Sequence, residues 1–195
     1  MPPSLTTRRG PVAVLAAALP LLTGCYRWVG IGDSVLFHTG GEVRNTLGPD
    51  GLVDVSIGRG PTSNPFGDTT VLEAVADRAP LVDPGGWQLV QDDGSHATPA
   101  SFRAMVADVN ALVPDDVCIA WVAPYNVWEQ RRDAALAAAL RSAGARHPCN
   151  VVVPWDEVAA ADPTAYLTDG LHPTIAGEVA FAEAVADAIA AGAAG

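Results

Sequence analysis

The chain has 195 residues, with 22 aspartates and glutamates against 11 arginines and no lysine, and a formal net charge of −11. This length fits one domain with a full hydrophobic core. The acidic balance argues against a nucleic-acid partner, because phosphate binding requires a basic surface.

The first 25 residues have the pattern of an export signal. Arg8 and Arg9 form a short basic region, Val12–Leu22 is apolar, and the Leu-Thr-Gly-Cys run that ends at Cys25 fits a bacterial lipobox. A buried first helix, a conventional cleavage that leaves Cys25 unmodified, and a later natural start are the alternatives. We expect residues 1–25 to be a signal peptide with a lipobox, and the protein to be a membrane-anchored lipoprotein or secreted. Its membrane contact would be only a lipid on Cys25.

The first predicted strand begins at Tyr26 and ends in the turn Gly32-Asp33-Ser34. Glycine permits the tight turn, and the amides that follow can converge on one point. A hydroxyl placed there is a common arrangement for a nucleophile. The same three residues also form ordinary turns and helix N-caps.

Strand-like and helix-like patterns then alternate along the chain. Short apolar runs indicate strands, and a period of 3.6 residues indicates helices. In chain order we expect a strand at Val53–Ile57, a helix at Thr69–Arg78, a strand at Trp87–Gln91, a helix at Pro99–Leu112, a strand at Val117–Ala123, a helix at Trp128–Ala143, a strand at Val151–Val153 and a helix at Ile175–Ala191. This alternation predicts an α/β fold, a three-layer α/β/α sandwich around a five-stranded parallel sheet. The domain would cover residues 26–195.

Two cysteines lie at the starts of the fourth and fifth predicted strands. Cys118 and Cys149 would be neighbours at the amino edge of the sheet. Outside the reducing cytosol this placement suggests a disulfide. Two partly buried thiols are the alternative.

A second polar motif, Asp169-Gly-Leu-His172 followed by Pro173, precedes the last predicted helix. Serine, aspartate and histidine in this order, with the acid three residues before the base, resemble the SGNH (GDSL-type) hydrolase family. The resemblance spans residues 26–190. The Gly58-Arg59 pair after the second strand, and tryptophans after the fourth and fifth strands, are similar to the branch that includes SGNH domains of cell-envelope O-acetyltransferases. These tryptophans are Trp128 and Trp155, and Gly60 replaces the glutamine usual in that branch.

The resemblance assigns chemical roles. Ser34 would be the nucleophile, His172 the base that takes its proton and then protonates the leaving alcohol, and Asp169 the acid that orients the imidazole. The amides of Ser34 and Gly58 would form an oxyanion hole. Its third donor in the family is an asparagine, and that position aligns here with Asp93, which cannot donate when ionised. The alternatives are a protonated Asp93, replacement of the donor by Gln91 or a water, and an Asp93 that turns away as an ordinary loop acid.

Other candidate residues carry weaker signals. Arg59 and His96 are candidates for substrate contacts. Trp128 and Trp155 have two interpretations, sugar stacking and core packing. The scattered histidines lack metal-ligand spacing, so we expect neither a metal nor another cofactor.

These features predict a monomeric esterase that hydrolyses a small, acetyl-like oxygen ester. Its substrate would be a small acyl ester or an acylated envelope or extracellular saccharide. Acyl transfer to a sugar acceptor and a catalytically weak binding domain are the alternatives.

Overall fold

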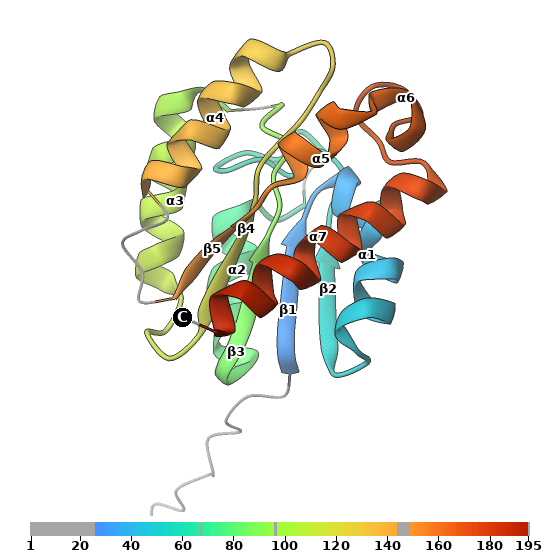
Figure 1. Ribbon diagram of the computed structural model, residues 1–195. Coiled ribbons are helices and arrows are strands. Elements are labelled where there is room, and N and C mark those ends of the chain that lie inside the picture. The colour runs from blue at the N-terminus through green and yellow to red at the C-terminus, as the bar shows by residue number, and fades with distance from the viewer. Residues whose placement is uncertain (1–25, 67, 96, 144–148, 195) are drawn as a thin grey trace, which may run out of the picture.

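The chain folds around a five-stranded parallel sheet covered by helices on both faces (Figure 1). The computed structural model describes residues 26–66, 68–95, 97–143 and 149–194. The strands lie side by side in the order β2-β1-β3-β4-β5, which are Gly51–Val55, Tyr26–Gly32, Val82–Val90, Cys118–Val122 and Asn150–Val153. Every neighbouring pair is parallel. The predicted α/β/α sandwich is therefore confirmed.

The helices divide between the two faces of the sheet. One apolar core lies under α2 (Val71–Arg78), α3 (Pro99–Leu112) and α4 (Gln130–Ala143), and the other under α1 (Ser34–Leu47), α5 (Trp155–Ala161) and α7 (Ile175–Ala193). Figure 1 shows α1 and α7 in front of the sheet and α2 behind it. The remaining elements are a 3-10 turn at Ala79–Leu81 and the short helix α6 at Pro163–Tyr166. No helix in these ranges is both long enough and apolar enough to cross a membrane.

The helix α1 was missed by the sequence patterns. Its centre holds Thr39, Gly40 and Gly41, which are poor helix formers. Packing decides in favour of the helix, because Val43 is buried and a Cβ at Gly40 would press against Val53 of β2. Gly40 has a low helix propensity, but its lack of a side chain lets α1 pack closely against the sheet.

The structure joins Cys118 and Cys149 by a disulfide, with their Cα atoms 4.9 Å apart. Cys118 is the first residue of β4, and Cys149 immediately precedes β5. The predicted pairing is therefore confirmed. The predicted signal peptide, including Cys25, lies outside the described residues.

Candidate active site

The turn between β1 and α1 presents Ser34 at the carboxyl edge of the sheet. Asp33 caps α1, because its Oδ1 accepts a hydrogen bond from the Val35 amide at 2.8 Å and its carbonyl accepts one from Phe37 at 2.9 Å. Asp33 is buried, with an exposed fraction of 1%. The aspartate of the Gly-Asp-Ser motif therefore fixes the turn that carries the hydroxyl.

Gln91, at the end of β3, holds the same turn from a second strand. Its Oε1 accepts hydrogen bonds from the amides of Asp33 at 3.1 Å and Leu36 at 3.2 Å. The amides around Ser34 are thus occupied, while the Ser34 amide donates to no acceptor in the described parts of the chain. This leaves it available to bind a developing oxyanion. The sequence suggested Gln91 as a possible donor and gave no sign that its oxygen holds the turn.

Three side chains form a connected row at this edge. His172 Nε2 lies 3.0 Å from Ser34 Oγ, and His172 Nδ1 lies 2.7 Å from Asp169 Oδ2. Partial burial acts to raise the pKa of Asp169, but hydrogen bonds from the His172 side chain and backbone outweigh it and lower this pKa to about 2. Asp169 is therefore ionised at neutral pH. The structure brings together all three residues of the predicted triad.

The loop that carries Asp169 and His172 is pinned by the segment after β4. Val127 donates its amide to the Gly170 carbonyl at 2.9 Å, and Trp128 donates Nε1 to the Asp169 carbonyl at 3.1 Å. Gly170 has a φ of +87°, and a Cβ there would overlap Val127. The Trp128 indole remains 80% exposed beside the row. It therefore positions the loop and offers an open aromatic surface.

The second predicted oxyanion donor, Gly58, follows β2. It has a φ of +70°, and a Cβ there would overlap the ring of Phe66. The Gly58 amide, like that of Ser34, donates to no acceptor among the residues described. Glycine is required here for both the backbone conformation and the close approach of Phe66.

Asp93, the third predicted oxyanion residue, is tied into its own loop. Its backbone amide donates to Asp33 Oδ2 at 2.6 Å, and its Oδ1 accepts from the Ser95 amide at 2.7 Å. The first bond joins the loop after β3 to the nucleophile turn, and the second lies within that loop. They give Asp93 a structural role that the alignment with an asparagine did not indicate.

Asp33, Asp92 and Asp93 form a carboxylate cluster, with one oxygen from each within 4.8 Å of the others. Burial, and then the charges of Asp93 and Asp92, raise the pKa of Asp33 well above its usual range. Burial likewise raises the pKa of Asp92 to about 7. Carboxylate oxygens suit protons or a hard cation. The cluster comes from two separate segments, so sequence spacing did not reveal it.

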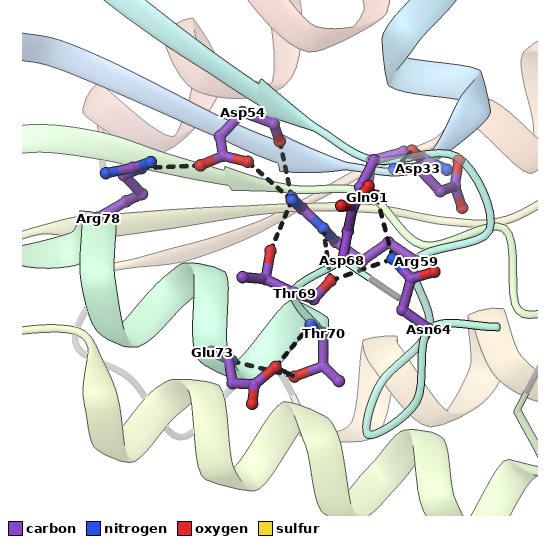
Figure 2. A network of polar contacts seen from close by, with 11 residues as sticks. Asp33, Asp54, Arg59, Asn64, Asp68, Thr69, Thr70, Glu73, Arg78 and Gln91 are labelled. Carbon is purple, nitrogen blue, oxygen red and sulfur yellow. Dashed lines mark hydrogen bonds and ion pairs between the residues drawn. The ribbon is translucent and has the colours of Figure 1, made fainter. Parts of the chain in front are cut away.

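Arg59 differs from the expectation of a substrate contact. Its exposed fraction is 3%, and its guanidinium donates to the Asp54 carboxylate at 2.7 Å and to Thr69 Oγ1 at 2.9 Å. Figure 2 shows this network with Arg78, which donates to the other Asp54 oxygen at 2.7 Å. Arg59 therefore holds the loop after β2 against α2, and its charge is satisfied internally.

The remaining candidates separate by exposure. Trp155 is buried against Phe181, with ring centroids 5.2 Å apart, which supports core packing. His96 lies outside the described residues. His38, which the sequence did not single out for this site, lies on the exposed side of α1 with its ring 5.3 Å from that of His172.

No protein-family model and no curated protein sequence matches the chain significantly. Solved structures do resemble it. The C-terminal catalytic domain of peptidoglycan O-acetyltransferase A from Streptococcus pneumoniae, solved with a methylsulfonyl adduct, has a TM-score of 0.69 at 17% identity, covering 86% of this chain and 94% of that chain. TesA has a TM-score of 0.64 at 13% identity, covering 85% and 98%. A GDSL-like lipase from Parabacteroides merdae has a TM-score of 0.57 at 12% identity, covering 87% and 97%.

These similarities define the class of fold. The chain has the SGNH/GDSL hydrolase fold, as its motifs predicted. At such identities the likeness establishes the fold alone, and the chemistry rests on the residues of this chain.

Proposed function

We propose that this protein is an exported serine esterase that hydrolyses a small, acetyl-like oxygen ester. The observation that carries the proposal is the continuous row from Ser34 Oγ through His172 to Asp169, with contacts of 3.0 and 2.7 Å. A hydroxyl becomes a useful nucleophile when an oriented base can take its proton. The ionised Asp169 holds the imidazole and stabilises its charged form.

The reaction follows from this geometry. Ser34 Oγ attacks the acyl carbon while His172 Nε2 takes its proton. The tetrahedral oxyanion is bound by the amides of Ser34 and Gly58, which have no competing acceptor among the described residues. His172 then protonates the leaving alcohol, and a water activated by His172 releases the acid from Ser34.

The acidic cluster bears on this step because it lies beside the nucleophile turn. A full negative charge ~4 Å from the oxyanion would cost about 4 kcal/mol at an effective dielectric near 20. Burial raises the pKa of Asp33 well above its usual range and that of Asp92 to about 7, so both carboxyl groups bind a proton more readily than an exposed aspartate does. Protonation removes much of this repulsion.

Export is supported by two features. The pattern of residues 1–25 is that of a signal peptide, and the Cys118–Cys149 disulfide suits an oxidising compartment. We propose lipid attachment at Cys25 as the sole membrane contact, a monomeric state, and no nucleic-acid partner because of the net charge of −11.

Acyl transfer to a sugar is the second candidate function. It is favoured by the similarity to the catalytic domain of a peptidoglycan O-acetyltransferase and by the exposed Trp128 indole beside the triad, which could stack on a sugar ring. An acylated saccharide is therefore the first natural substrate class to examine.

A panel of p-nitrophenyl esters tests the proposal. We expect p-nitrophenolate release from the short-chain esters, with acetate as the second product from p-nitrophenyl acetate, and loss of turnover in Ser34→Ala. Adding saccharide acceptors and identifying products by mass spectrometry separates hydrolysis from transfer. Undiminished hydrolysis by Ser34→Ala would contradict the proposed mechanism.

A further inference from the structure

A largely apolar pocket of about 490 Å³ lies between α1 and the loop after β2. Its walls include three large side chains that are unusually exposed, namely Phe37 at 57%, Ile57 at 55% and Phe66 at 70%. Exposed apolar side chains gathered in one place mark binding sites more often than isolated ones do. Phe37 comes from α1, while Ile57 and Phe66 come from the loop after β2.

The residues that line this pocket adjoin two of the proposed reacting groups. Phe37 lies three positions after Ser34 on α1, so both residues lie on one face of the helix. Phe66 packs directly on Gly58, a proposed oxyanion donor, and Ile57 precedes that glycine. A substrate held by Ser34 therefore has these side chains within reach.

The Ser56 hydroxyl, a polar group of the pocket, is already engaged. Ser56 Oγ donates to Asp68 at 2.7 Å and accepts from Asn64 at 3.0 Å. The Arg59 network holds the same loop from its other side (Figure 2). The pocket thus has a fixed floor and apolar walls, which suit a hydrocarbon group.

A row of three rings, those of Phe37, His38 and His172, indicates which half of the ester enters the pocket. The Phe37 ring packs edge-on against His38, with centroids 5.6 Å apart, and the His38 ring lies 5.3 Å from that of His172. His172 Nε2 protonates the leaving oxygen, so the alcohol half must lie beside His172. The aromatic row leads from that position to the pocket.

We propose that the pocket of Phe37, Ile57 and Phe66 binds an apolar group on the alcohol side of the ester. An aryl or alkyl alcohol, or a saccharide that carries such a group, is then preferred over a bare sugar. This inference rests on the proposed esterase function and narrows its substrate class.

The test compares two ester series on the purified protein. In one, acetate is fixed and the alcohol grows from methyl through butyl to benzyl. In the other, methanol is fixed and the acyl chain grows from acetyl to hexanoyl. We expect kcat/KM to rise roughly tenfold or more from methyl to benzyl acetate, as apolar area enters the pocket, with no such rise in the acyl series.

Substitutions then locate the selectivity. Phe66→Ala and Phe37→Ala, on separate elements, should each lower the benzyl-to-methyl ratio of kcat/KM by roughly tenfold relative to wild type. The ratio compares two acetates, so any change in the oxyanion site affects both esters alike. Leu112→Ala, which truncates an exposed leucine on α3 outside the site, should leave the ratio unchanged.

Distinct outcomes separate the two proposals. Esterase activity with a ratio unaffected by Phe66→Ala and Phe37→Ala would overturn the pocket assignment alone. So would effects of these variants confined to the acyl series, or a preference for acetylated sugars that neither variant alters. Failure of the wild-type protein to hydrolyse any ester would instead overturn the esterase function, and the inference with it.

Discussion

Replacing Asp92 by asparagine should make the protein more stable at alkaline pH. Asp92 has an exposed fraction of 3%; its Oδ1 accepts from the Gly94 amide at 2.7 Å, and its Oδ2 has no hydrogen-bond partner among the described residues. Burial raises its pKa from 3.8 to about 7. The folded protein therefore keeps a proton on Asp92 that the unfolded chain releases near pH 4.

The sign and size follow from proton linkage. Between pH 4 and pH 7 the folded state binds one more proton at this site, so the free energy of unfolding falls by about 1.4 kcal/mol per pH unit. Roughly three units of pKa difference correspond to about 4 kcal/mol, present at pH 4 and lost above pH 7. Asp92→Asn removes this loss, because a neutral amide needs no proton.

Urea denaturation at pH 4.5, 6 and 8 measures the effect. We expect the decline in unfolding free energy from pH 4.5 to pH 8 to be smaller in Asp92→Asn by up to about 4 kcal/mol. Asp108→Asn, an exposed position on α3, is the matched control and should follow wild type. Equal declines in wild type and Asp92→Asn would refute the assigned burial and protonation.

Three further predictions concern the loops and the disulfide. Gly170→Ala should lower kcat roughly a hundredfold, because the added methyl group has no room and displaces the loop that carries Asp169 and His172. Gly85→Ala is the control, because Gly85 also has a positive φ (+74°) but open space around it, and this variant should keep full activity. Reducing the Cys118–Cys149 bond, which spans 31 residues, should cost about 3–4 kcal/mol of unfolding free energy and lower Tm, whereas an unchanged Tm on reduction would speak against the pairing. Asp93→Asn should raise kcat by removing a carboxyl group from the loop beside the nucleophile turn, while its amide oxygen still accepts from the Ser95 amide. A lower kcat would assign Asp93 another role.

The motifs predicted what depends on local chemistry. The Gly-Asp-Ser turn and the Asp-x-x-His spacing predicted that Ser34, Asp169 and His172 lie together, because each motif is short and has the residue types that the proposed reaction requires. The alternation of apolar runs predicted the sheet because strand and helix periodicity is also a local property of the sequence. Some element boundaries differ from the predicted ones by a few residues. For example, β3 begins at Val82, whereas the sequence placed its start at Trp87 after the Pro-Gly-Gly turn.

Features that depend on distant contacts could not be predicted in this way. The sequence made Arg59 a candidate for a substrate contact, but in the fold its guanidinium donates to Asp54 and Thr69. The acidic cluster needs Asp33 from one strand end and Asp92 from another. No local pattern reports such burial, because charge neutralisation and desolvation are set by the neighbouring elements.

Covalent labelling with a fluorophosphonate tests the central claim most directly. The reagent reacts with a serine whose proton is taken by a neighbouring base, so it reports activation of Ser34 without requiring the natural substrate. We expect mass spectrometry to find one phosphonyl group on Ser34 in the wild-type protein, none in Ser34→Ala, and greatly slowed labelling in His172→Ala. Ser142→Ala, which alters a serine on α4 away from the triad, should label like wild type. Failure of the wild-type protein to react, or labelling that persists in Ser34→Ala, would contradict the account.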